Sequence, residues 1–136
     1  MSNTEKTLSI IKPDAGERNL ENEIKAMFKG KGFQIVKEKK IQITKSEAEQ
    51  FYKVHETKPF YNDLCTYLSS GPITVMVLEK ENAILANREL MGATKPEEAA
   101  EGTIRKKYGI SIDKNSVHGS DSVENAKIEI DFFFKD

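Results

Sequence analysis

The sequence predicts a sandwich of the α/β or α+β class, in which helices pack on one sheet. Segments in which apolar residues have the spacing of a strand alternate with segments in which they have the spacing of a helix, which indicates mixed secondary structure. Glycine, proline and helix-capping residues separate these segments from one another. The length of 136 residues is that of one compact domain, so we expect a single domain over residues 1–136.

The N-terminal third of the chain predicts two strands and one helix. Residues 8–11 form a short apolar strand, and residues 12–16 after it have the composition of a turn. Residues 20–28 repeat apolar side chains at helical spacing. Residues 33–43 carry apolar side chains of one parity and predict a long strand, in which the charged residues 37–40 favour an exposed edge or a bulge.

The middle of the chain predicts two helices and a buried strand. Thr44 and Glu47 have the spacing of a capping box and predict a helix that runs to about Val54. A further helix is expected over about residues 59–68, ahead of a Ser-Ser-Gly-Pro sequence that ends it. Residues 73–78 are almost wholly apolar and β-branched, which is typical of a central strand.

The C-terminal part predicts two helices, a short strand and a long loop. Asn82 as N-cap and Gly92 just past the last turn are the expected ends of one helix. Residues 92–116 predict a long irregular stretch, and loops of that length in compact domains are usually functional. Residues 117–118 predict a short strand, and residues 121–124 have the pattern of a capping box before a final helix.

Charge and cysteine content exclude several classes of protein. Lys and Arg number 21 against 22 Asp and Glu, and general binders of nucleic acids or anionic membranes need a clear basic excess. No apolar stretch approaches the roughly 18 residues of a membrane span, and the N-terminus lacks the apolar region of a signal peptide. We therefore expect a cytoplasmic protein with no nucleic-acid or membrane partner. The single Cys65 cannot form an intrachain disulfide and is either a small core residue or a reactive thiol.

The two histidines are the candidate centres of covalent chemistry, since the phosphate-binding patterns GxxxxGK[ST] and GxGxxG are absent. His55 lies at the end of the helix that begins at Thr44, where a cation would interact with the helix dipole. His118 follows the long loop and precedes Gly119 and a helix start, where free backbone N–H groups favour an anion. A neutral imidazole is a competent nucleophile, and the alternative is a turn histidine capped by its neighbours.

Lys12, Arg88 and Arg105 are the cationic side chains that could bind phosphate. Arginine suits bidentate phosphate contacts, while lysine acts as a compact point charge. Taken alone, each of them is more often a solvated surface charge. Thr94 is a further candidate phosphate ligand with a helix N-cap as its alternative role, and Phe60 alone predicts a core residue.

Taken together, these segments resemble the nucleoside diphosphate kinase family over essentially the whole chain. The most specific match is Asn-x-x-His-Gly-Ser-Asp-Ser at residues 115–122, and the other matches precede it in the family's order. They are Ile-Lys-Pro-Asp-Ala at residues 11–15, Tyr-x-x-His-x-x-x-Pro-Phe at residues 52–60, Asn-Arg at residues 87–88, residues 91–99, and Gly-Thr-Ile-Arg at residues 102–105.

The resemblance implies a ferredoxin-like sandwich, with a four-stranded antiparallel sheet covered by helices. It implies ping-pong transfer of the terminal phosphate of a nucleoside triphosphate, mainly ATP, to a nucleoside diphosphate through a phosphohistidine at His118, which maintains the NTP and dNTP pools. Mg²⁺ carried by the nucleotide phosphates is the implied cofactor, and a homo-oligomer, tetramer or hexamer, is the implied assembly. The competing hypothesis is a non-catalytic relative that binds nucleotides as a regulatory scaffold.

The resemblance also implies catalytic roles for five residues of this chain. His118 would be the nucleophile, and Lys12 would act with it on the nucleotide. Tyr52 would lie beside the transferred group. Ser120 and Glu129 would support the nucleophile, with Glu129 holding the histidine ring from the last helix and leaving its other nitrogen free to attack.

The resemblance implies a second set of residues that bind the nucleotide. Lys12 and Asn115 would contact the sugar hydroxyls, and Lys12 would also reach phosphate. Phe60 would stack on the base, with Leu64 nearby, and such stacking tolerates any base because every base has a π-face. The residues implied to hold the phosphates are Arg88, Thr94 and Arg105.

The chain departs from the family pattern at three positions. Glu101 stands where the family usually has proline, Tyr61 replaces a common phenylalanine, and Gly16 replaces a frequent valine. None of these is an implied catalytic group, so the departures concern assembly and loop rigidity rather than activity.

Overall fold

Four strands form one antiparallel sheet in the computed structural model of this chain, in the order β2-β3-β1-β4. The structure describes residues 4–53, 56–59, 61–93, 95–109, 116–120 and 122–134. The strands are β1 (Thr4–Ile11), β2 (Gln34–Ile41), β3 (Ile73–Glu81) and β4 (Val117–Gly119). The sheet order places the two longest apolar strands, β1 and β3, in the centre.

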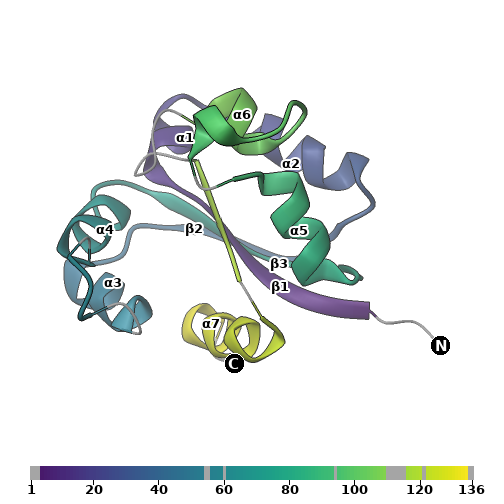
Figure 1. Cartoon of the computed structure of the whole chain (residues 1–136). Coiled ribbons are helices and arrows are strands. Elements are labelled where there is room, and N and C mark those ends of the chain that lie inside the picture. The colour runs from purple at the N-terminus through teal and green to yellow at the C-terminus, as the bar shows by residue number, and fades with distance from the viewer. Residues whose placement is uncertain are drawn as a thin grey trace.

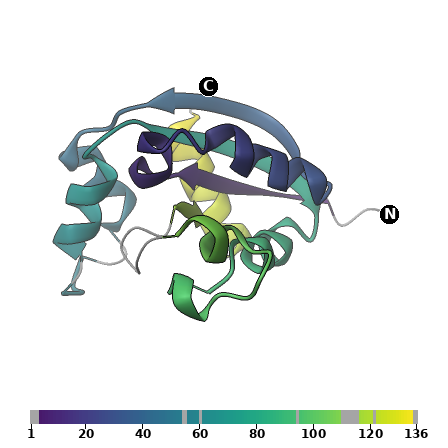
Figure 2. The ribbon, with the colours of Figure 1, turned by 90° about the horizontal axis from the view of Figure 1, so that it is seen from above.

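Helices cover both faces of this sheet (Figures 1 and 2). On one side lie α1, α2, α5 and α6, and on the other side lies α7, while α3 and α4 lie side by side near one end of the sheet. The helices of the described part are α1 (Pro13–Glu17), α2 (Glu21–Gly30), α3 (Lys45–Phe51), α4 (Tyr61–Leu68), α5 (Ala83–Met91), the 3-10 helix η2 (Pro96–Glu98), α6 (Ile104–Tyr108) and α7 (Val123–Phe133).

Each face of the sheet has its own apolar core, because successive strand residues point to opposite faces. Met76 and Leu78 of β3 pack with Phe28 of α2 and with residues of α5 and α6. Leu8 and Ile10 of β1 pack on the other face with residues of α3, α4 and α7. This second core also contains Cys65, whose complete burial supports the first of its two possible roles, that of a small core residue.

Several elements confirm the sequence predictions. The sheet and its helices are the predicted ferredoxin-like α+β fold, with residues 73–78 inside the central strand β3. Strand β2 lies at the sheet edge and has an irregularity between Ile35 and Lys37, as the charged segment indicated. The capping box of α3 is complete, with the Thr44 side chain accepting from the Glu47 N–H and the Glu47 carboxylate accepting from the Thr44 N–H.

The prediction of a turn over residues 12–16 was wrong, since these residues contribute to the short helix α1. Pro13 occupies the first helical turn, where its missing N–H costs nothing and its fixed φ suits a helix. The long loop over residues 92–116 is also only partly irregular, because η2 and α6 form within it. Strand β1 begins at Thr4, four residues earlier than residues 8–11 suggested.

Two helix starts differ from the predicted caps. Asn82 lies at the start of α5 but has a left-handed φ of 53° and makes no side-chain cap. Instead the Glu5 carboxylate of β1 accepts a hydrogen bond from the Ile84 N–H at 3.2 Å. At α7 the N-cap is Ser122, whose hydroxyl accepts from the Asn125 N–H at 3.1 Å, so residues 121–124 are not the capping box.

The turn over residues 100–103 predicts that Glu101→Pro stabilises the protein. The Thr103 N–H donates to the Ala100 carbonyl at 3.3 Å, and Gly102 has a φ of 86°, which is the geometry of a type II turn. The exposed Glu101 then occupies the position that proline favours. We expect about 0.4–1 kcal/mol of stabilisation and a melting temperature higher by about 2–4 °C.

Thermal melts of Glu101→Pro and of Glu101→Ala measure this effect. Glu101→Ala removes the same charge without restricting the backbone, so it should not raise the melting temperature. A melting temperature of Glu101→Pro at or below the wild-type value would contradict the prediction.

Candidate active site

The sheet places His118 where its side chain is partly enclosed by neighbours and partly open to solvent. His118 lies in β4 opposite Ile10 of β1, so its side chain shares the sheet face on which α3, α4 and α7 pack. The side chain is 20% exposed, which leaves it reachable while its neighbours hold it.

Glu129 of α7 holds the imidazole ring. The Nε2 atom of His118 lies 2.9 Å from Oε1 of Glu129, and the Ser120 hydroxyl donates to the same oxygen at 2.9 Å. Ser120 is in turn held by β1, since its hydroxyl accepts from the Leu8 N–H and its N–H donates to the Leu8 carbonyl, each at 3.2 Å. A carboxylate can only accept, so Nε2 carries a proton, and in the neutral ring the lone pair is on Nδ1.

Aromatic side chains of α3 pack against the same ring. The centroid of Phe51 lies 5.3 Å from that of His118 in an edge-on arrangement, and Tyr52 lies 6.3 Å away at nearly a right angle. Burial, followed by the charge of Glu129, raises the pKa of Tyr52 above its usual range, so the phenol stays protonated. Sequence reasoning missed Phe51, because its helical spacing is that of an ordinary core residue.

Gly119 allows β4 to approach α5 closely. A Cβ atom at this position would lie 2.3 Å from Nδ2 of Asn87 and 2.7 Å from Cε of Met91, both shorter than van der Waals contact. A larger residue after the histidine would therefore force the Asn87 and Met91 side chains of α5 to move.

We expect Gly119→Ala to destabilise the protein by about 1–3 kcal/mol, since the added methyl group overpacks this contact. Thermal or denaturant melts measure the loss. Gly30→Ala is the matched control, because a Cβ at Gly30 meets no atom within 4 Å. Equal melting temperatures for Gly119→Ala and the wild type would contradict the prediction and would mean that the Asn87 and Met91 side chains make room for the methyl group at no cost.

Arg105 joins α6 to the strand of the histidine. Its Nη1 donates to the Gly92 carbonyl at 3.0 Å and its Nη2 donates to the Val117 carbonyl at 2.9 Å. Burial lowers the pKa of Arg105 to about 10, which leaves the guanidinium cationic at neutral pH. Its Nε is buried and has no hydrogen-bond partner within the described residues.

Arg88 and Arg105 line one hollow of about 540 Å³, although they come from different helices. Arg88 is exposed on α5, and its hollow also borders Gly92 and Thr103. Two arginines against one carboxylate, Glu89, give the lining of this hollow a net positive charge, which favours a polyanion such as a chain of phosphates. Lys12 lies directly after β1 and is buried, with its N–H donating to the Ser116 carbonyl at 2.8 Å.

The structure does not place every predicted site residue. Phe60, Thr94, Asn115 and the second histidine, His55, lie outside the described residues. Leu64 is half-buried in α4 and packs against the core that contains Tyr52. The described residues therefore bring His118 together with Tyr52, Ser120 and Glu129. Arg105 bonds the strand that contains His118, and Arg88 lines the same hollow as Arg105. Lys12 bonds Ser116, two residues before His118.

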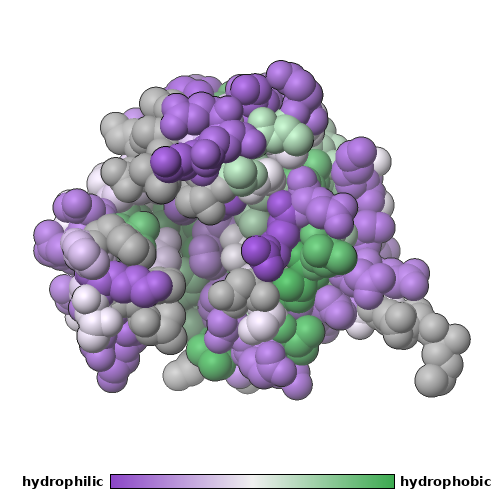
Figure 3. Space-filling model, viewed as in Figure 1, coloured by the Kyte–Doolittle hydropathy of each residue, from purple (hydrophilic) through white to green (hydrophobic). Residues whose placement is uncertain are grey.

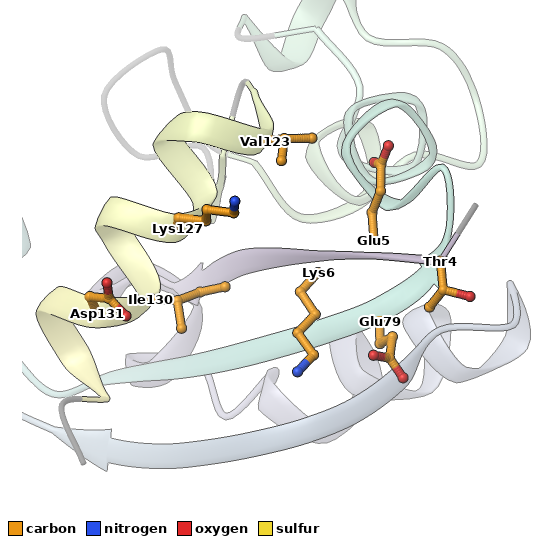
Figure 4. Close-up of a pocket in the computed structure, with 8 residues that line it drawn as sticks. All are labelled: Thr4, Glu5, Lys6, Glu79, Val123, Lys127, Ile130 and Asp131. Carbon is orange, nitrogen blue, oxygen red and sulfur yellow. The ribbon is translucent and has the colours of Figure 1, made fainter. Parts of the chain in front are cut away.

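A separate hollow of about 530 Å³ lies between α7 and the strands β1 and β3 (Figure 4). Its carboxylates outnumber its ammonium groups, so it does not suit a polyphosphate. None of the predicted site residues lines it. The residues that line it are Thr4, Glu5, Lys6, Glu79, Val123, Lys127, Ile130 and Asp131.

The sheet topology and its helices define a ferredoxin-like α+β protein, in which the Glu129 carboxylate contacts Nε2 of the partly exposed His118 ring. The sequence model of the family "Nucleoside diphosphate kinase" matches residues 5–136. The chain therefore belongs to the nucleoside diphosphate kinase family.

Individual relatives and solved structures agree with this assignment. A nucleoside diphosphate kinase of Persephonella marina is 58% identical over 130 residues, which are 96% of this chain and 93% of that protein. One of Geotalea uraniireducens is also 58% identical over 130 residues, 96% and 95% of the two chains. The crystal structure of the Aquifex aeolicus nucleoside diphosphate kinase superimposes with a TM-score of 0.96 at 43% identity, covering 97% of this chain and 96% of that one. That of the Encephalitozoon cuniculi enzyme gives 0.93 at 37% identity, covering 97% and 90%.

Proposed function

We propose that this chain transfers the terminal phosphoryl group of a nucleoside triphosphate to a nucleoside diphosphate through a phosphohistidine at His118. The observation that carries the proposal is the contact between Nε2 of His118 and the Glu129 carboxylate, which leaves Nδ1 as the only ring nitrogen able to attack. Membership of the nucleoside diphosphate kinase family supports both the reaction and its substrates.

The proposed reaction consists of two half-reactions, each a phosphoryl transfer. The Nδ1 lone pair attacks the γ-phosphorus, an N–P bond forms, and the bond from that phosphorus to the bridging oxygen breaks, so a nucleoside diphosphate leaves. A terminal oxygen of a second diphosphate then attacks the phosphorus, and the N–P bond breaks to return the imidazole. The ring is positively charged while phosphorylated and protonated on Nε2, and the Glu129 carboxylate stabilises that charge.

Phosphoryl transfer depends mostly on positioning and charge neutralisation, which the surrounding residues would supply. Arg88 and Arg105 would bind phosphate oxygens in the hollow that they share. Tyr52, kept protonated by its burial, would offer a neutral hydroxyl donor rather than a repelling phenolate. Further contacts expected from the family pattern are those of Lys12 and Asn115 with the sugar, Thr94 with phosphate, and Phe60 and Leu64 with the base.

Mg²⁺ would enter the site with the nucleotide. Among the described residues, no three His, Cys, Asp or Glu side chains lie close enough together to hold a metal ion. Glu129, the carboxylate beside the nucleophile, is already engaged by His118 and Ser120. A magnesium ion held by the nucleotide phosphates needs no such group of protein ligands and would neutralise part of the phosphate charge.

A homo-oligomer, a tetramer or a hexamer, is part of the proposal. Hydrophobic side chains reach the surface over α5 and α7 (Figure 3), and the large ones on these helices are Leu85 at 60% exposure, Val123 at 42% and Ile128 at 67%. Leu85 and Val123 border one hollow, and contiguous exposed apolar surface is typical of association sites. Light scattering across a dilution series measures the mass of the assembly.

Two further expectations accompany the proposal. The chain is expected to be one domain over residues 1–136 and to be located in the cytoplasm. The longest helix in the described part of the chain, α7, has 11 residues, and none there is suited to crossing a membrane.

Incubation with γ-labelled ATP tests the proposed function. The protein should acquire label that is labile in acid and stable in alkali, as a phosphohistidine is, and should lose it to added nucleoside diphosphate. Nucleotide binding without such label would contradict phosphoryl transfer and would instead indicate a regulatory scaffold.

A further inference from the structure

The carboxylate of Asp14 is buried at the end of the sheet next to the proposed active site. Asp14 is 4% exposed, and its oxygens are bonded by two side chains from distant parts of the sequence, Tyr67 and Ser116, and by the nearby Arg18. Oδ1 accepts from the Tyr67 hydroxyl of α4. Oδ2 accepts from the Ser116 hydroxyl at 2.9 Å and from Nη2 of Arg18 at 3.2 Å. A buried carboxylate that accepts this many hydrogen bonds is held in one position.

Ser116 connects the Asp14 carboxylate to the strand that contains His118. It lies two residues before His118, and its φ of 76° is a left-handed conformation that serine rarely adopts. Its hydroxyl donates to Asp14, while its carbonyl accepts from the Lys12 N–H at 2.8 Å. The unusual backbone at Ser116 is therefore held from both its side chain and its main chain.

Tyr67 fixes the other side of the carboxylate. Its hydroxyl accepts from the Asp14 N–H at 2.7 Å and donates to the Asp14 side chain, so it contacts the residue twice. Burial, followed by the hydrogen bond to Asp14, raises the pKa of Tyr67 above its usual range, and the phenol remains a donor. The hydrogen bonds of Asp14 reach Ser116, two residues before His118, and Asp14 would affect catalysis through this contact.

We propose that Asp14 is a positioning residue that holds Ser116 and thereby sets the place of Nδ1 of His118 relative to Lys12 and the bound phosphates. The inference rests on the proposed phosphoryl transfer through His118. Misplacement of a reacting atom by about 1 Å can cost about a hundredfold in rate, so a contact outside the substrate site can govern the chemical step.

The first test compares Asp14→Asn with the control Asp131→Asn in the full-length protein. Asp131 is exposed on α7, and its replacement makes the same change of charge away from the site. We expect Asp14→Asn to slow phosphorylation of His118 by ATP ten- to hundredfold in single-turnover experiments. The ATP concentration at half-saturation should change less than threefold, because Asp14 touches no nucleotide in this arrangement.

Ser116→Gly separates positioning from stability. Glycine adopts a positive φ without strain, so the fold should tolerate it, but the hydroxyl that bonds Asp14 is lost. We expect a melting temperature within about 3 °C of wild type, together with at least a tenfold slower phosphorylation. Combined with Asp14→Asn, it should add less than threefold to the loss, since both variants weaken the same hydrogen bond between residues 14 and 116.

Tyr67→Phe completes the set if Asp14→Asn fails to fold, because it keeps the ring and removes only the hydroxyl. It should slow phosphorylation at least threefold. Variants that melt at lower temperature but phosphorylate His118 at the wild-type rate, measured well below their melting temperatures, would overturn the inference and leave Asp14 a structural residue. Failure of the wild-type protein to label at all would overturn the proposed function instead.

Discussion

His118→Ala is expected to abolish phosphoryl transfer, with at least a thousandfold loss of activity, equivalent to about 4 kcal/mol in the barrier. The substitution removes the only ring nitrogen that the Glu129 contact leaves free. The fold should survive, because the side chain is partly exposed and Glu129 keeps its hydrogen bond from Ser120. Labelling from γ-labelled ATP and coupled assays of nucleoside triphosphate formation measure the loss.

The other histidine supplies the control for this experiment. His55→Ala removes the same ring and should label at the wild-type level. Retention of acid-labile phosphate in His118→Ala would place the phosphorylated residue elsewhere and contradict the proposed mechanism.

Glu129→Gln is expected to lower activity about ten- to a hundredfold while leaving the protein folded. Glutamine can occupy the same space and still accept from Nε2 of His118 through its amide oxygen. It cannot balance the positive charge of the phosphorylated ring, and it can present its NH₂ group to the ring instead. The loss should therefore appear in the rate of phosphorylation more than in nucleotide binding, and rapid-quench kinetics separate the two.

Glu124→Gln is the matched control, since Glu124 is exposed on the same helix. The same activity in Glu129→Gln as in Glu124→Gln would show that the charge at residue 129 has no part in transfer.

Much of the fold could be predicted from local patterns. Residues 73–78 of strand β3 are mostly apolar or β-branched, and the Thr44 capping box specifies the start of α3 from side chains that lie within one turn. The prediction for residues 12–16 failed because proline, aspartate and glycine suit both a turn and the first turn of a helix. At α5 the Glu5 carboxylate bonds the first turn from β1, 79 residues away, and no local pattern at Asn82 reveals that.

The candidate site could be predicted only where a residue carries its own chemical signal. His118, Glu129 and Arg105 have reactive or charged side chains, and the family pattern marked them. Phe51 and Tyr67 give no such signal, because a half-buried aromatic residue in a helix is usually part of the core. Their contacts with His118 and Asp14 arise from the tertiary packing of α3 and α4 against the sheet.

The candidate site can form only after most of the chain has been synthesised, because its residues come from both early and late segments. The hydrogen bond between Leu8 and the Ser120 hydroxyl joins residues 112 positions apart, and β1, one of the first elements made, pairs with β4, one of the last. Such distant pairings close large loops and form late in folding. A growing or truncated chain that lacks α7 also lacks Glu129, so an incomplete product has no carboxylate in contact with the His118 ring. Activity in a cell therefore reports on molecules whose translation has passed that last helix.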